Sequence, residues 1–136
     1  MITLYYSNKS FIKLKDNILY VNIQFNNNNL DLITLLEYFK NIFLLTKENN
    51  NKYYLHINIL NICILSKNFI DNILNTLIEL NEIFKSNLHS TGLLIYSNEL
   101  LTIIKPILNY YNTIRPFKIC NSEEEIIQFF KNNNLN

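Results

Sequence analysis

The stretch LHINILNICILSKNFIDNILNTL, residues 55–77, changes its hydrophobic period partway along. Its first part alternates between apolar and polar side chains, which is typical of a β-strand; the apolar members are Leu55, Ile57 and Ile59. Its second part repeats every three or four residues, which is typical of an amphipathic helix; its apolar members are Ile70, Ile73, Leu74 and Leu77. The junction ILSKN therefore predicts a turn from a strand into a helix.

The same two periods recur on both sides of this junction and predict an α/β fold. Strands are expected at about 1–6, 11–25, 53–62, 92–97 and 113–120, and helices at about 32–43, 68–85, 98–111 and 121–133. Asp16-Asn17 is a turn pair, and a loop holding Gly92 is expected to lead into GLLIYS. The order is β-β-α-β-α-β-α-β-α, which implies one antiparallel hairpin followed by parallel crossovers in a mixed, mostly parallel sheet.

Local signals refine three of these elements. GLLIYS is almost wholly apolar, so it is expected to be a central strand that is buried on both faces. Pro116 cannot donate to a β-ladder, so the last strand is expected at an edge. Ser122 followed by Glu125 forms a capping box at the start of the last helix. Pro106 lies inside the helix expected at 98–111 and is expected to kink or shorten that helix.

Composition predicts one domain over 1–131, with a frayed tail at 132–136. The 136 residues are 49% hydrophobic and carry a net charge of +1, which gives no support for a nucleic-acid partner. No apolar run approaches the roughly 20 residues that span a bilayer, and no signal peptide is recognised. Cys63 and Cys120 lie far apart, so a reducing cytoplasm is expected. The excess of Asn, Ile, Leu and Lys indicates an AT-rich genome.

The chain carries no recognised motif for catalysis, a cofactor or a metal. A single glycine excludes both phosphate-cradling glycine motifs, and there is no G-x-S-x-G elbow. The residues Glu123–Glu125 are interpreted as the acidic first turn of a helix. The candidate metal ligands lack the local spacing of zinc sites; they are His56, Cys63, His89 and Cys120. We therefore expect a non-enzyme with no cofactor and no metal.

The order of elements resembles that of the STAS domain family, which includes the bacterial anti-sigma-factor antagonists. INILNICILSKNFIDNIL looks like the family's apolar strand, Asp-Ser-Ser-Gly turn and helix, and residues 92–130 look like the family's ending. The resemblance implies a sheet with helices packed mainly on one face. It also implies a serine or threonine in the turn that a partner kinase phosphorylates to release a bound protein.

At that turn the chain departs from the family pattern. Strand register aligns Ser66 with the family's Asp, and it aligns Lys67 with the phosphorylated serine, which lysine cannot replace. Asn68 and Phe69 then align with the second Ser and the Gly of the family's turn. Ser66 is a phosphoacceptor if the turn shifts by one residue, and otherwise it is an N-cap. Lys67 is interpreted as a fixed positive charge for constitutive binding.

Two functions from different classes follow. The first is a non-catalytic regulatory or scaffold domain that binds another protein, such as a kinase-type regulator or a larger complex. Its expected surface comprises Ser66, Lys67, Asn68, Phe69, Ile70 and Asn72. The alternative is a small-ligand or nucleotide-binding domain with its site at the strand carboxyl ends, near Ser66, Ser97 and Asn98. A homodimer through the edge strand at 114–120 is a third arrangement.

Overall fold

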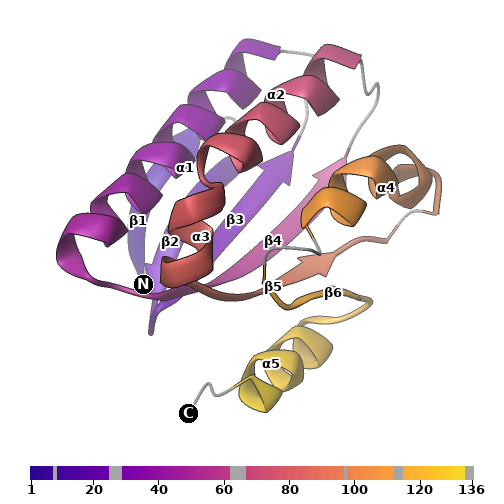
Figure 1. The fold of residues 1–136 in the computed structure, drawn as a ribbon. Coiled ribbons are helices and arrows are strands. Elements are labelled where there is room, and N and C mark those ends of the chain that lie inside the picture. The colour runs from indigo at the N-terminus through magenta and orange to yellow at the C-terminus, as the bar shows by residue number, and fades with distance from the viewer. Residues whose placement is uncertain (8, 25–28, 62–66, 97, 112–114, 134–136) are drawn as a thin grey trace.

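The protein is described by a computed structural model that covers residues 1–7, 9–24, 29–61, 67–96, 98–111 and 115–133. Within these ranges, the side chains at 29–31, 60–61, 67–70, 100, 103–104, 107–108 and 110–111 lie outside the description. Figure 1 shows one sheet with helices lying across it. The α/β class expected from the sequence is confirmed.

The sheet that the described residues form has six strands in the order β1-β2-β3-β4-β5-β6. The pairs β1–β2 and β2–β3 are antiparallel, and the remaining pairs are parallel. The strands are β1 (Ile2–Ser7), β2 (Ser10–Lys15), β3 (Ile18–Gln24), β4 (Tyr53–Asn61), β5 (Leu88–Leu94) and β6 (Phe117–Cys120). The helices are α1 (Asn29–Asn49), α2 (Lys67–Glu79), α3 (Asn81–Asn87), α4 (Asn98–Tyr111) and α5 (Glu123–Asn132).

Three strands precede the first helix where the sequence predicted two. Asp16 and Asn17 both have positive φ, at 52° and 65°, which is the backbone of a two-residue hairpin turn. The segment at 11–25 is therefore two strands, β2 and β3, while the strand predicted at 1–6 is β1 at the edge of the sheet. The Ser10 hydroxyl ties the hairpin's open end, since it accepts from Gln24 N at 2.9 Å and lies 3.1 Å from Gln24 O.

One face of the sheet forms the main hydrophobic core with α1, α2 and α3. The strand residues on this face alternate as the sequence predicted, because Leu19 pairs with Leu55, Val21 with Ile57 and Ile23 with Ile59. The helices close over them with large apolar side chains, including an aromatic cluster of Phe39, Phe43 and Phe84. Leu101 of α4 packs against the same cluster, so four helices share this face (Figure 1).

The single helix expected at 68–85 is two helices, α2 and α3. Leu80 separates them and is completely buried. Its backbone N–H still donates to the Thr76 carbonyl at 3.1 Å, and its carbonyl accepts from Phe84 N at 2.9 Å. The chain therefore turns toward the sheet without losing these two hydrogen bonds, and Ile83 and Phe84 enter the core.

Gly92 lies inside β5, not in the expected loop. The strand starts at Leu88, and Gly92 pairs with His56 on β4 and Lys118 on β6. A Cβ at this position would lie 2.6 Å from Ile126 Cγ2. Glycine therefore allows α5 to approach the strand backbone closely, which is a recognised use of glycine in a strand.

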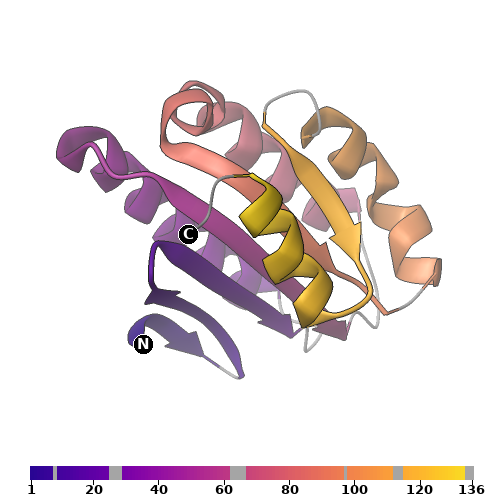
Figure 2. The same cartoon turned by 90° about the horizontal axis from the view of Figure 1, so that it is seen from below.

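The last helix, α5, covers the opposite face of the sheet. Figure 2 shows it on the side of the sheet away from the other four helices. Ile126 and Phe130 are fully buried there against Tyr54, Leu94 and Cys120. The expected cap is confirmed: Ser122 Oγ accepts from Glu125 N at 3.2 Å, and the Glu125 carboxylate accepts from Asn121 N at 3.0 Å. Helices are therefore mainly, not wholly, on one face.

The two edges of the sheet differ. β6 is an edge strand of four residues, as the sequence predicted, and Pro116 precedes it with its carbonyl accepting from Thr91 N at 2.9 Å. β1, at the other edge, has six residues and no charged side chain, and its exposed residues include Ile2 and Tyr6. A register shift between Thr3 and Tyr5 interrupts its pairing with β2.

Candidate functional site

The turn that the sequence singled out lies at one end of the parallel strands. Ser66 itself is outside the described residues, and Lys67 is the first residue of α2. Asn68, Phe69 and Ile70 follow in the first turns of this helix, but their side chains are not described. Asn72 is half-buried, and its carbonyl accepts from Thr76 Oγ1 at 2.9 Å. The expected strand-to-helix junction is thus present around this turn.

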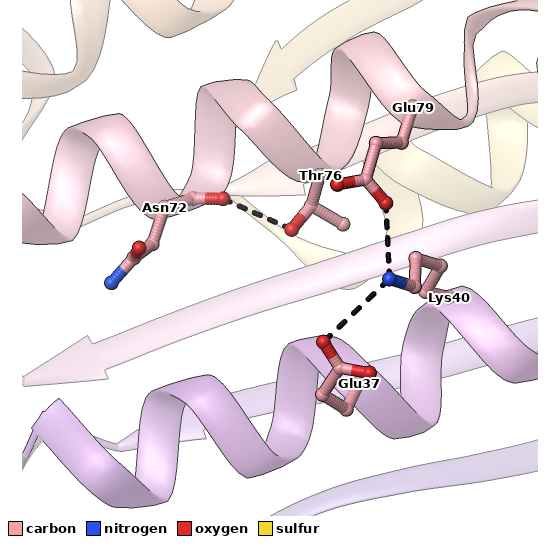
Figure 3. A network of polar contacts seen from close by, with 5 residues as sticks. All are labelled: Glu37, Lys40, Asn72, Thr76 and Glu79. Carbon is pink, nitrogen blue, oxygen red and sulfur yellow. Dashed lines mark hydrogen bonds and ion pairs between the residues drawn. The ribbon is translucent and has the colours of Figure 1, made fainter.

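The position of α2 is held by a polar contact with α1. Lys40 Nζ lies 3.0 Å from Glu79 Oε2 and 3.6 Å from Glu37 Oε1, and Figure 3 shows this bridge between the two helices. The hydrogen bond to Glu79 raises the pKa of Lys40, and the charge of Glu37 acts in the same direction. The contact is solvent-exposed, so it orients the helices more than it stabilises them.

A second group of residues shares the rim where α2 begins. β4 and β5 are parallel neighbours, so α2, which follows β4, and α4, which follows β5, both start at the carboxyl edge of the sheet. Tyr96, just before α4, is 67% exposed. Sequence patterns give no signal for Tyr96, because the residue continues the apolar run GLLIYS that predicts a strand. Asn98 is exposed there, while Ser97 lies outside the description.

A concave feature of the described residues lies on the face of the sheet beside α5. It is a groove of about 370 Å³, with a floor made by β2, β3 and β4. The strand register places two rows of side chains across this floor. One row is Lys13, Tyr20 and His56, and the other is Phe11, Asn22 and Asn58.

The walls of the groove carry opposite charges. Lys13 and Lys15 line it from β2, while Glu123 lines it from the first turn of α5. Lys13 Nζ lies 4.2 Å from the centroid of the Phe11 ring, which is within range of a cation–π contact. The cationic wall and the carboxylate are therefore on different sides of the groove, with β3 between β2 and β4.

Burial sets the protonation state of Tyr20 and His56, the two ring residues of the first row. His56 is only 4% exposed, and its burial lowers the pKa of the imidazole more than the carboxylate of Glu123 raises it. Burial also raises the pKa of the neighbouring Tyr20 hydroxyl, and Glu123 acts in the same direction. The two ring centroids are 5.0 Å apart. At neutral pH both rings are therefore uncharged, and the charges of the groove lie on its walls.

The second row contains a polar atom that lacks a partner among the described residues. Asn22 is 8% exposed, and its Nδ2 donates to the Lys9 carbonyl at 3.1 Å. Asn58, its neighbour in the parallel register, has a buried Oδ1 with no hydrogen-bond donor. A buried acceptor left unpaired is unfavourable in the folded state.

The residues weighed for a metal site are dispersed. His56 lies on β4 in the groove, His89 stacks on Tyr54 with centroids 4.5 Å apart, and Cys120 is buried under α5. Cys63 is outside the description. Across the described part of the chain, no three His, Cys, Asp or Glu residues are grouped so that they could hold a metal ion. The Glu123–Glu125 run lies in the first turn of α5, as predicted.

Comparisons with known proteins leave the family of the chain open. No family model matches the chain, and no curated protein or solved structure matches it either. In the parts of the chain that the structure covers, every helix is too short or too polar to span a bilayer. The function therefore has to be argued from the geometry of the rim and of the groove.

Proposed function

We propose that the protein is a non-catalytic binding domain of the STAS type that docks on another protein, using the rim where α2 and α4 begin. The order of elements supports this proposal. From β2 onward the order is β-β-α-β-α-β-α-β-α when α2 and α3 are counted as one interrupted helix, which is the order that the resemblance implies. The cysteine usage supports a cytoplasmic location.

The observation that carries the proposal is the exposure of Tyr96. A tyrosine that is 67% exposed at the end of a buried strand offers a large, rigid apolar surface, and such residues are enriched among those that dominate interface affinity. Asp71, Asn98 and Glu99 are also exposed near the starts of the two helices. An aromatic side chain within a polar surround is the usual anatomy of a protein interface.

The proposed binding is constitutive and is not controlled by phosphorylation. A phosphate at a helix N-terminus changes both the local charge and the available hydrogen-bond acceptors. In this chain Lys67 stands where the family's phosphorylated serine is expected, and it opens α2. A fixed cation at this position favours an acidic partner surface. The proposal therefore needs no phosphate on Ser66.

The test is capture of partners from extract of the source cells by the tagged chain, with quantitative mass spectrometry. We expect Tyr96→Ala, Phe69→Ala and Lys67→Glu each to reduce capture of one partner about tenfold or more, because Tyr96 is exposed at the rim and the other two residues open the helix that begins there. The matched control is Tyr6→Ala, since Tyr6 is 63% exposed on the edge strand β1, which β2 and β3 separate from β4. The control is expected to capture the partner as the natural chain does.

Three results would count against the proposal. Equal capture by all four variants would remove the rim as the docking surface. Stoichiometric phosphate on Ser66 in the same mass spectra would contradict the constitutive form of binding. A stable dimer in sedimentation, abolished by changes at β6 and not at the rim, would favour self-association through that edge.

A further inference from the structure

The groove beside α5 is separate from the rim and carries an inference of its own. Its floor belongs to a face of the sheet that α5 covers only in part, because α5 packs mainly on β5 and β6 and reaches β4 at Tyr54, near the start of that strand. In Figure 2 β1 and β2 lie clear of α5. Side chains of β2, β3 and β4 therefore face a space that the described helices do not fill.

The groove offers acceptors on one side. Glu123 contributes a carboxylate from α5, and Asn58 contributes an amide from β4 whose Oδ1 has no donor within the described structure. Oδ1 is shielded from solvent, but the χ2 torsion of asparagine has a broad, shallow profile. A modest rotation of the amide therefore turns this acceptor toward a ligand that brings an N–H group.

The groove offers cations on the other side. Lys13 and Lys15 come from β2, and Lys13 is positioned over the Phe11 ring. β2 and β4 are two strand spacings apart, which is about 10 Å. The cations therefore line the β2 side of the groove and the acceptors line the other side, with the partly exposed ring of Tyr20 on β3 between them.

We propose that this groove binds a small zwitterion of amino-acid or dipeptide size that carries an aromatic or apolar group. Its ammonium group donates to Glu123 and Asn58, its carboxylate accepts from Lys13 and Lys15, and its apolar group packs on Tyr20. A volume of about 370 Å³ falls at the lower end of the range for small-molecule sites. A purely anionic ligand would leave the acceptors unpaired, and a purely cationic one would leave the lysines unpaired.

The experiment titrates the full chain with small-molecule probes that differ in one charge at a time. Calorimetry and backbone amide NMR monitor the binding. The probes are phenylalanine and glycyl-phenylalanine, N-acetyl-phenylalanine as the anion alone, phenylalaninamide as the cation alone, and adenosine monophosphate. At least one of the two zwitterions is expected to bind and to shift the amides of Asn22, His56 and Asn58. Each singly charged analogue is expected to bind with an affinity lower by about tenfold or more.

Matched variants locate the site. Lys13→Glu and Asn58→Leu are each expected to lower the affinity for the zwitterion about tenfold or more. Lys85 is an exposed lysine on α3, and Lys85→Ala is expected to leave this affinity unchanged. Thermal melts confirm that each variant is folded. Three outcomes would overturn the proposal: no binding of either zwitterion, equal affinity for N-acetyl-phenylalanine, or binding of adenosine monophosphate alone. Failure of the rim variants to lose a protein partner bears on the docking proposal and leaves this one standing.

Discussion

The two faces of the sheet are built from the same strands but differ in what they do. The face toward α1, α2 and α3 is lined by Leu, Ile and Val, and it is closed by three phenylalanines with almost no exposure. The opposite face carries Tyr, His, Asn and Lys, and the ten-residue helix α5 covers only part of it. The comparison teaches that the larger apolar core lies on one face, while the other keeps polar side chains and, among the described residues, an unpaired buried acceptor on Asn58.

The largest effect is expected from matched phenylalanine truncations on the two faces. Phe84 and Phe130 are both fully buried. Phe84→Ala leaves a cavity between three elements and is expected to lower the free energy of unfolding by about 3–5 kcal/mol. Phe130→Ala is expected to cost less, about 2 kcal/mol, because α5 can detach locally while the main core stays folded. Urea denaturation of both variants measures the difference, and equal losses would break the comparison.

A smaller effect is expected at the contact that fixes α5. In Gly92→Ala the new Cβ would lie 2.6 Å from Ile126 Cγ2, so α5 must shift, at a cost of about 1–3 kcal/mol. Ile126→Ala removes Cγ2 together with Cγ1, so Gly92→Ala should cost less in that background, which a double-mutant cycle measures as coupling. If the two changes were additive, the close approach of α5 to β5 would not be the reason for glycine here.

Much of the architecture could be predicted from the sequence because it rests on periodicity. The alternation in 55–59 and the helical stripe from Leu32 to Phe43 each fixed an element and its buried face. The turn pair was also readable, since Asp16 and Asn17 both have positive φ at the hairpin. The predicted capping box of Ser122 and Glu125 is present, because it depends only on residues that are close in sequence.

What could not be predicted depends on contacts between distant residues. Gly92 reads locally as a loop residue, and only the packing of Ile126 from α5 explains its place inside a strand. The groove joins residues of β2, β3 and β4 with Glu123, which no local spacing connects. Tyr96 was read as a strand residue because its exposure depends on where β5 ends.

The smallest effect is expected from pH. Burial lowers the pKa of both His56 and His89 below the ordinary value of 6.5. The unfolded chain therefore binds more protons below that value, so the free energy of unfolding decreases as the pH falls from 7 to about 5.5. His56→Gln and His89→Gln should each reduce this dependence, and the double variant should remove it. Stability that increased on acidification would contradict the burial of both rings.

Asn58→Leu is the most direct test of the claim that the partly covered face is kept for recognition. An unpartnered buried acceptor is unfavourable in the folded state, so its replacement by an apolar side chain of similar size is expected to raise the free energy of unfolding by about 1 kcal/mol. The measurement is equilibrium urea denaturation of the natural chain and the variant. The comparison requires that the unfolding free energy depend on urea concentration with the same slope in both. A variant that is more stable supports the account, and one that is less stable by a similar amount would show that Asn58 serves the fold.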